Sequence, residues 1–553
     1  MKHLRNDLAL CLWLGLTVLP LYSQSEKTNL EFTRQELFAW ESRLWGSTKC
    51  GFSIVAELRA MRDKDPRAAA LLKLKAFRPS LQHSYLTPEG LFRIHYDTTG
   101  NNAVNPFSTI QAGVPDYVFE AGLAAQRSYS LLVDTLGMRP HTSDNGDDGP
   151  EDPGPEFDFY IINQPSSRYG ETFINDDKSS YTTLDNDYST YFSKGLNGLR
   201  VTVAHEYFHA VQTSYIFRRE DIFFFEISSS WFEDFAYDEV NDYFGYLRSW
   251  FRNITLPLNT KDNFHEYGSA LWLHYLTKRL GTPEIVRRLW ERIAQEPAVF
   301  AMKNVLQSNP YNLPFNQALQ EFYSWCFFTN HRADEERYFA EGADYPAIKL
   351  DRPPTLEQNE TISGNSSPLS AQYSAFLRNA QEVQAHLQIQ VDPGRFGLTL
   401  FASDENDEYL ARTGYGLAPV FASAQARQDT IVFLVVNNGL TADEYELKIT
   451  LGNQIKLENL LEAPYPNPFR SHTAGILTVP YRLSETSAVE AAIFSDDGRR
   501  VWNKKPERKT IGAGTMEWNG RDEEGRLVPS GVYIMRFWAG AFAASTKIVV
   551  INR

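Results

Sequence analysis

Two histidines with the spacing of metal ligands lie in the stretch VTVAHEYFHAVQTSY. His205 and His209 are four residues apart, which puts them on one face of a helix, so that both imidazoles can bind one zinc ion. Glu206 then lies beside the open coordination position, where a carboxylate can take the proton of a zinc-bound water. The H-E-x-x-H pattern therefore predicts metal-assisted hydrolysis. The alternative is two unrelated surface histidines.

A catalytic zinc ion needs about three protein ligands, so one more must come from another part of the chain. The next predicted helix contains WFEDFAYDEVNDY, in which Glu233 begins an E-x-x-A pattern and the small Ala236 permits close approach of two helices. We therefore predict Glu233 as the third ligand. Glu226 is expected before the start of this helix, and the other competing carboxylates are Asp234, Asp238 and Glu239.

The combination of H-E-x-x-H with a glutamate on the next helix resembles the gluzincin metallopeptidases. The metzincin pattern is excluded, because Gln212 and Tyr215 stand where it requires Gly and His. Several gluzincins carry a tyrosine in a stretch like the one from Tyr267 to Ala270, which implies that Tyr267 stabilises the oxyanion, with His265 as a second candidate. The residue that usually separates Tyr from Gly is missing here, and a tyrosine packed in the core is the alternative.

Residues 88–330 also resemble a group of uncharacterised bacterial surface metallopeptidases. The resemblance rests on the stretches GLFRIHYDTTGNNAV, HEYFHAVQ, WFEDFAYDEVNDY and YGSALWLHYLTKRLG. It implies a gluzincin-like α+β domain with peptidase activity on a peptide or protein substrate, and it brings no known substrate.

The elements that must position these residues follow a simple order. Strand patterns at 90–97, 157–163 and 179–187 precede most of the helical patterns, which are 115–138, 197–215, 229–241, 265–280, 284–296 and 314–329. Strands followed by helices indicate an α+β domain rather than repeated βαβ units. We expect 179–187 to be an edge strand, and residues 180–185 to pair with an extended peptide substrate.

The chain divides by composition into five parts. Residues 1–25 are typical of a signal peptide, with Lys2, His3 and Arg5 before a short apolar run, although a buried N-terminal helix is the alternative. Residues 26–87 are helical and are either a prosegment or a helical cap. A metallopeptidase domain at 88–352 precedes a β-sandwich domain at 355–455, and an Ig-like β-sandwich occupies 462–553.

Charge and cysteine content limit the partners. The net charge is −15 with no block of Lys and Arg, which argues against nucleic acid. Cys11 lies in the leader, and the remaining pair, Cys50 and Cys326, forms one bridge or stays free. The acidic loop 141–156 offers ligands that calcium uses, but its spacing fits no known calcium loop, and a solvated insertion is the alternative.

The C-terminal part carries a further pattern. The stretches YPNPF (465–469), GRRVW (498–502), GAGTMEWNGRDEEGRLVPSGVYIMRFWAG (512–540) and TKIVVINR (546–553) resemble the C-terminal Ig-like sorting domain of type IX secretion cargo and the flagellar-hook-cap Ig-like domain. The resemblance implies that secretion machinery recognises this domain and that the protein is secreted or held at the cell surface. The alternative is a generic binding or spacer domain.

We therefore expect a secreted zinc metallopeptidase with no transmembrane segment in the mature chain. His205, His209 and Glu233 are the expected zinc ligands, and Glu206 is the expected general base. The rival hypothesis is a cell-surface binding or adhesion protein whose peptidase-like domain is inert.

Overall fold

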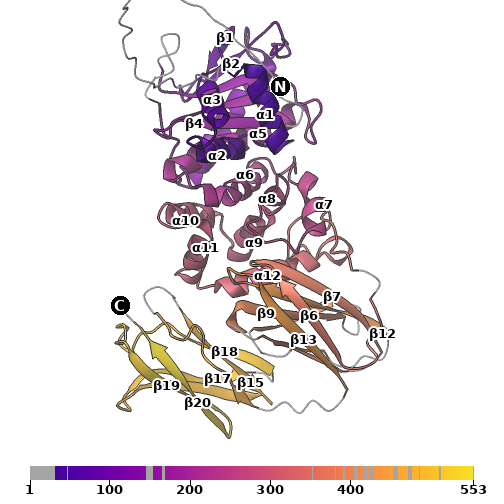
Figure 1. Cartoon of the computed structure of the whole chain (residues 1–553), viewed down its shortest axis with the longest axis vertical. Helices are drawn as coiled ribbons and strands as arrows, with labels where there is room; N and C mark the ends of the chain where they lie inside the picture. Colours follow the sequence, from indigo (N-terminus) through magenta and orange to yellow (C-terminus); the bar gives the residue numbers. More distant parts are fainter. Residues whose placement is uncertain are drawn as a thin grey trace, which may run out of the picture.

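The computed structural model describes residues 32–46, 48–144, 154–164, 168–350, 353–379, 382–389, 393–403, 409–415, 420–422, 428–452, 459–470, 476–484, 486–509 and 512–551. The predicted signal peptide and much of the acidic loop at 141–156 lie outside these residues. Within them, no helix is long and apolar enough to cross a membrane. Figure 1 shows an α+β part at one end, a helical layer in the middle and two β-rich parts at the other end. The expected combination of a multidomain α+β protein with β-sandwiches is confirmed.

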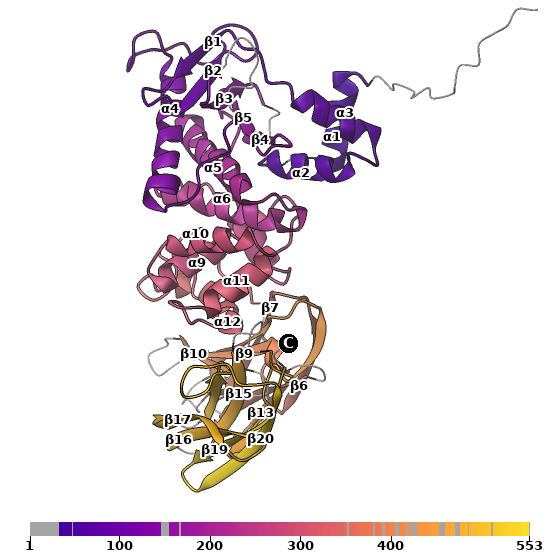
Figure 2. The same cartoon turned by 90° about the vertical axis from the view of Figure 1, so that its left-hand side faces the viewer.

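Three helices form the N-terminal part: α1 (Arg34–Trp45), α2 (Phe52–Met61) and α3 (Pro66–Lys75). Thr33 and Glu36 form a capping box at the start of α1, and Pro66 begins α3 behind the capping residue Asp65, where proline needs no hydrogen bond. The helices share a small core with three aromatic residues of the neighbouring sheet, Tyr160, Phe173 and Tyr181. Figure 2 shows this helical unit beside β4 (Gly170–Ile174).

The α+β part is built on a five-stranded sheet with the order β1-β2-β3-β5-β4. The other strands are β1 (His83–Leu86), β2 (Phe92–Tyr96), β3 (Phe157–Ile162) and β5 (Ser180–Asp185). Strands β2, β3 and β5 run parallel, and the outer two pair antiparallel. Helix α4 (Asp116–Tyr129), extended by a π-helical turn (Ser130–Thr135), connects β2 to β3. The domain therefore contains one βαβ crossover that the order of patterns did not predict.

The edge strand next to the candidate site is β4, and this corrects the prediction for 180–185. Strand β5 lies between β3 and β4. Its residues are buried on both faces, and Thr182 Oγ1 hydrogen-bonds Thr172 Oγ1 across to β4 at 2.8 Å. Its serine and threonines resemble an exposed strand in sequence, but here Thr182 bonds to Thr172 of β4 and Thr183 Oγ1 accepts a hydrogen bond from Gln164 Nε2 at 2.6 Å.

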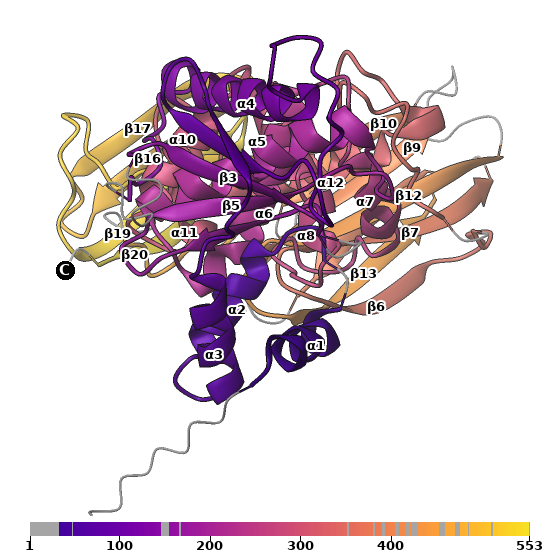
Figure 3. The same cartoon turned by 90° about the horizontal axis from the view of Figure 1, so that it is seen from above.

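Helices α4 and α5 (Gly195–Tyr215) contact the sheet, and α6 (Ile222–Ala236) packs on α5. Figure 3 shows α4 and the N-terminal helices on opposite sides of β3 and β5. The helical layer continues with α7 (Phe244–Arg252), α8 (His265–Gly268), α9 (Leu271–Leu280), α10 (Glu284–Ile293), α11 (Ala298–Gln307) and α12 (Phe315–Phe327). Helix α6 begins seven residues before the predicted start at 229, a difference that decides the ligand set below.

A β-sandwich packs against α12. Its sheets have the orders β10-β9-β12-β7 and β11-β8-β13-β6, and the ring of Phe401 in β9 stacks on Phe327 of α12 at 4.1 Å. The strands are β6 (Glu360–Ser366), β7 (Ser370–Asn379), β8 (Val383–Gln388), β9 (Phe396–Ser403), β10 (Tyr409–Tyr415), β11 (Val420–Ala422), β12 (Gln428–Asn437) and β13 (Asp443–Leu451). This contact makes the sandwich a support for the helical layer.

The C-terminal part has its own core around Trp518, with sheets β14-β15-β18 and β17-β16-β19-β20. Its strands are β14 (Leu460–Leu461), β15 (Leu477–Leu483), β16 (Ser487–Ser495), β17 (Arg500–Lys509), β18 (Gly512–Trp518), β19 (Gly531–Ala539) and β20 (Phe542–Val550). Gly520 and Gly525 adopt positive φ in turns of this part. Val532 and Ile534 share the outer face of β19, because side chains alternate along a strand.

Candidate metal centre

Helix α5 carries both histidines into the interior of the α+β part. The helix lies between the sheet and α6, and nearly all its residues from Gly198 onward are buried. The rings of His205 and His209 are 4.7 Å apart between centroids, as expected for side chains one turn apart on one face. The predicted pair of imidazoles therefore shares one site.

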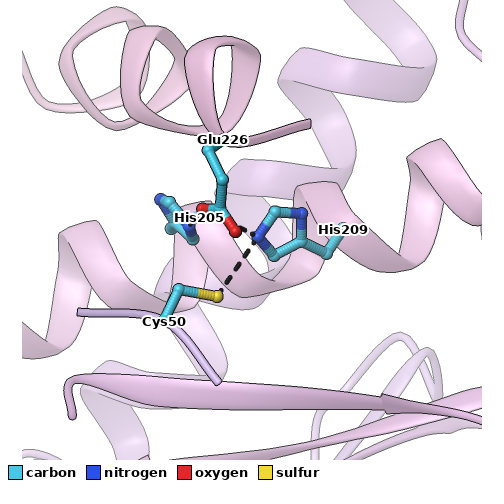
Figure 4. Close-up of side chains that lie close together, drawn as sticks. All are labelled: Cys50, His205, His209 and Glu226. Atoms are coloured by element: carbon cyan, nitrogen blue, oxygen red, sulfur yellow. Dashed lines mark hydrogen bonds and ion pairs between the residues drawn. The ribbon is translucent and has the colours of Figure 1, made fainter. Parts of the chain in front are cut away.

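Four potential ligands converge at this site: Cys50, His205, His209 and Glu226 (Figure 4). One ligand atom from each lies within 4.8 Å of all the others. Glu226 Oε2 is 3.2 Å from His205 Nε2 and 3.6 Å from His209 Nε2, and Cys50 Sγ is 3.3 Å from His209 Nε2. The Nε2 atoms of both imidazoles therefore face the same point.

The Nδ1 atoms of both imidazoles face away from the cluster and contact acceptors. Glu233 Oε1 is 2.6 Å from His205 Nδ1, and Gln212 Oε1 is 2.8 Å from His209 Nδ1. Because these oxygens accept, each Nδ1 donates its hydrogen and leaves Nε2 as the atom with a lone pair when the ring is neutral. Partners of this kind fix the orientation of metal-binding histidines in known sites.

Glu226 replaces Glu233 as the candidate third ligand, which corrects the prediction. Helix α6 already begins at Ile222, so Glu226 lies inside the helix, and Glu233 lies on the same face about two turns further on. The carboxylate of Glu233 contacts the Nδ1 side of His205 and forms an ion pair with Lys49 Nζ at 2.7 Å. Glu233 therefore orients His205, while Glu226 faces the Nε2 atoms.

The donor set fits a zinc ion. Two imidazole nitrogens, a carboxylate and a sulfur are the ligand types that zinc prefers. Glu226 Oε1 is buried and has no hydrogen-bond partner among the described residues, which is costly for a carboxylate unless a cation lies beside it. Burial raises the pKa of Glu226, but the charge of His209 and the hydrogen bond from His205 outweigh it and lower the pKa to about 2. This carboxylate is therefore ionised at neutral pH.

Glu206 is held next to the cluster by the edge strand. Thr172 of β4 donates a hydrogen bond to Glu206 Oε2 at 2.7 Å. A side chain at Gly170 would place its Cβ 2.8 Å from Glu206 Cγ, so glycine permits the close approach of α5 to β4. Burial and then the charges of Glu206 and Glu226 raise the pKa of Cys50 well above its usual value.

Tyr267 lies near the cluster, and His265 packs elsewhere. The ring of Tyr267 is 6.3 Å from that of His205, and burial followed by the charge of Glu226 raises its pKa well above 10, so that its hydroxyl keeps its proton. The ring of His265 stacks on Trp250 at 6.0 Å, and burial lowers its pKa to about 4. Of the two predicted oxyanion donors, the structure brings only Tyr267 next to a candidate ligand.

The competing carboxylate Asp234 belongs to a second acidic group, which it forms with Asp238 and Glu341. This group does not include His205 or His209. Asp234 Oδ1 has no hydrogen-bond partner within the described ranges. Burial, followed by the charges of Glu341 and Asp238, raises the pKa of Asp234 to about 8. The exposed Asp238 and Glu239 lie beyond the end of α6, as expected.

We expect Asp234→Asn to stabilise the protein in a pH-dependent way. A folded-state pKa of about 8 against an unfolded value of about 3.9 means that the folded state binds more protons between these pH values. Asp234 therefore costs no stability below pH 4, and its cost grows as the pH rises to 8. The unfolding temperature of Asp234→Asn should exceed that of the wild type by an amount that grows as the pH rises from 4 to 8. The control Asp63→Asn, at an exposed carboxylate, should unfold at the same temperature as the wild type. Parallel curves for Asp234→Asn and the wild type would contradict the assignment.

Both cysteines of the described chain are buried and free, so they do not form the bridge that the sequence left open. Cys326 lies in α12, where its thiol donates to the carbonyl of Phe322 at 3.3 Å. Cys50 instead belongs to the group of candidate metal ligands. Sequence reasoning missed this role, because a single cysteine 159 residues before His209 gives no sign of its neighbours.

No protein-family model matches this chain, and no curated protein matches it. Among solved structures, it is similar to a part of PorZ, a surface component of the type IX secretion system of Porphyromonas gingivalis, with 18% identity over 19% of this chain and 14% of that one and a TM-score of 0.14. It is also similar to latent PorU from Porphyromonas gingivalis, with 14% identity over 37% of this chain and 19% of that one and a TM-score of 0.17.

A β-glucuronidase from Faecalibacterium prausnitzii overlaps 35% of this chain and 38% of its own, with 11% identity and a TM-score of 0.12. The chain thus spans well under half the length of each of these three structures. Similarities with such low TM-scores carry no argument about activity, and the functional argument rests on the residues of the site.

Proposed function

We propose that this chain is a zinc-dependent peptidase of the gluzincin type, with His205, His209 and Glu226 as zinc ligands and Glu206 as general base. The observation that supports it best is the convergence of both Nε2 atoms and a buried carboxylate next to Glu206. When bound, zinc would polarise the scissile carbonyl and lower the pKa of a bound water. Calcium, the second ion considered, has no comparable support, since much of the acidic loop lies outside the described residues.

The chain's own residues supply the remaining chemistry. Glu206 would accept the proton of the attacking water and later deliver it to the leaving amine, while Thr172 holds its carboxylate in place. Tyr267, which keeps its proton, would donate a hydrogen bond to the developing oxyanion. His265 is not included in this mechanism, because its ring partner is Trp250.

We also propose that the protein acts outside the cell or on its surface. The support is the N-terminal signal pattern and the resemblance of residues 462–553 to the sorting domains of type IX secretion cargo. In this proposal the secretion machinery recognises the C-terminal Ig-like domain.

A peptide-library digest with wild type and Glu206→Gln, combined with metal analysis, tests the activity. We expect one zinc per chain in both proteins and a kcat/KM about 10²–10⁴-fold lower in the variant, since this is the usual contribution of a general base. Glu220→Gln, at an exposed carboxylate, is the matched control. Absence of bound zinc, or equal cleavage by wild type and Glu206→Gln, would contradict the proposal.

The second candidate is a surface binding protein with an inert peptidase-like domain. One observation favours it: the cluster offers four ligands, and structural zinc sites use four protein ligands with no open position. Such a protein would keep its zinc and its ligand affinity unchanged in Glu206→Gln.

A further inference from the structure

The short segment Thr48–Phe52 closes the candidate metal centre. Cys50 Sγ is 3.3 Å from His209 Nε2, and the ring of Phe52 stacks on that of His209 at 4.1 Å between centroids. In this state His205 and Glu206 are each 1% exposed, and His209 and Glu226 are fully buried. A peptide bond cannot reach these residues at this exposure.

The same segment pairs with the first residue of β4, at the free edge of that strand. The amide of Gly51 donates to the carbonyl of Gly170 at 2.9 Å, and the amide of Tyr169 donates to the carbonyl of Lys49 at 2.8 Å. These bonds form an isolated parallel bridge between Cys50 and Gly170. An exposed strand edge next to a catalytic centre is a common place for an extended peptide to bind through its backbone. Here the chain itself takes the start of that edge, at Gly170.

Buried ion pairs hold the segment in position. Lys49 Nζ lies 2.7 Å from Glu233 and 2.7 Å from Asp242. Two more ion pairs join the neighbouring helices to residues on either side of Gly170. Glu41 of α1, before the segment, pairs with Arg168. Lys75 of α3, after the segment, pairs with Glu171. The segment therefore fits the edge of β4 closely and is attached to a helical unit that packs on the same strand.

Resting on the proposed function, we propose that Thr48–Phe52 is an inhibitory segment that keeps the peptidase latent. Cys50 Sγ would be the fourth ligand of a zinc ion held by His205, His209 and Glu226, and would leave no ligand position for the water that hydrolysis needs. The backbone of the segment lies where an extended peptide substrate pairs with β4. The active state forms when the segment leaves this edge, at which point a water replaces the sulfur and the released thiolate takes a proton from solvent.

One feature distinguishes a latent catalytic site from a permanent structural one. A structural zinc site needs no base, yet Glu206 lies beside the cluster and is oriented by Thr172. Glu226 Oε1 lacks a hydrogen-bond partner in the described part of the chain, which supports a bound cation in either case. The base therefore carries the argument for a site that works once the sulfur has left.

The test compares the full-length wild type with Cys50→Ala and with the matched control Cys326→Ala, since both cysteines are fully buried. After replacement of zinc by cobalt, we expect a near-ultraviolet thiolate-to-cobalt charge-transfer band in wild type and in Cys326→Ala. Cys50→Ala should keep one cobalt per chain and lose the band. Its peptide cleavage should rise by about 10–1,000-fold, if the open state of the wild type is a minor species of about 0.1–10%.

A second variant guards against a folding defect in the first. A Cβ at Gly51 would lie 2.3 Å from Glu171 Oε2 and 2.6 Å from Glu171 Cβ, so Gly51→Val should push the segment off β4 while the thiol remains. We expect a weaker cobalt band and faster cleavage than in wild type. Both effects should appear together.

The outcomes separate the two proposals. One cobalt per wild-type chain without a thiolate band, or an active Cys50→Ala no faster than the wild type, would overturn latency and leave the peptidase proposal intact. A Cys50→Ala protein that binds cobalt but cleaves no peptide would overturn both and favour a structural site. Failure of every form to bind metal would also overturn both.

Discussion

Glu226→Ala is expected to weaken zinc binding far more than Glu233→Gln, although Cys50, His205 and His209 remain. Glu226 Oε2 faces the Nε2 atoms of both histidines, so its loss removes a ligand. Glu233 contacts His205 on the Nδ1 side and acts on the zinc only through the ring. Loss of such an outer partner costs about 10–100-fold in metal affinity, and loss of the ligand should cost much more.

Zinc affinity measured by competition with a chelating indicator checks this order. Glu239→Gln is the matched control, because it is an exposed carboxylate just beyond the same helix and should bind zinc like the wild type. Circular dichroism of each variant shows whether the helices are retained. A Glu233→Gln protein that loses zinc while Glu226→Ala keeps it would restore the ligand set that the sequence predicts.

The difference between these two glutamates shows where sequence reasoning stops. The spacing of His205 and His209 is local, so one helical face predicts that their side chains meet. The third ligand depends on where the next helix begins. Asp221 stands at the N-cap position of the apolar stretch IFFFEISSS, although its side chain makes no cap hydrogen bond. The helix reaches back to Ile222, so the glutamate nearest the site is one that the predicted boundary excluded.

The edge strand of the sheet could not be predicted from the sequence either, because its polar residue is buried. In β4 the charged Glu171 is buried and forms two ion pairs. Lys75, which is distant in sequence, is one partner, and Arg168, three residues before Glu171, is the other. Nothing in the five letters GETFI reveals these partners, so the strand was missed and the edge was assigned to β5. The division into an α+β part and β-sandwiches could be predicted, because turn residues and strand alternation are local signals.

Lys49→Met is expected to destabilise the α+β part by about 3–5 kcal/mol, the usual cost of breaking a buried ion pair. Lys49 is nearly fully buried between Glu233 and Asp242, and its removal leaves two buried carboxylates without their cation. Burial lowers the pKa of Lys49, but the charges of Asp242 and Glu233 outweigh it, so the wild-type amine is charged. Urea denaturation followed by tryptophan fluorescence measures the loss.

Two further proteins make the measurement specific. Lys504→Met removes one partner of a half-exposed pair with Glu507 and should leave the denaturation curve unchanged. The double variant Lys49→Met/Asp242→Asn removes one of the stranded charges and should recover part of the lost stability, which a double-mutant cycle quantifies. A loss below about 1 kcal/mol for Lys49→Met would mean that the buried ion pair contributes little.

The same variant links stability to latency, because Lys49 lies in the segment that closes the metal centre. Its ion pairs exist only while the segment lies on β4, so they stabilise the closed state and not the open one. If the segment is inhibitory, Lys49→Met should cleave peptides faster than the wild type at temperatures where both remain folded. A permanent structural segment predicts the opposite, since a looser site would then lose zinc and gain no activity.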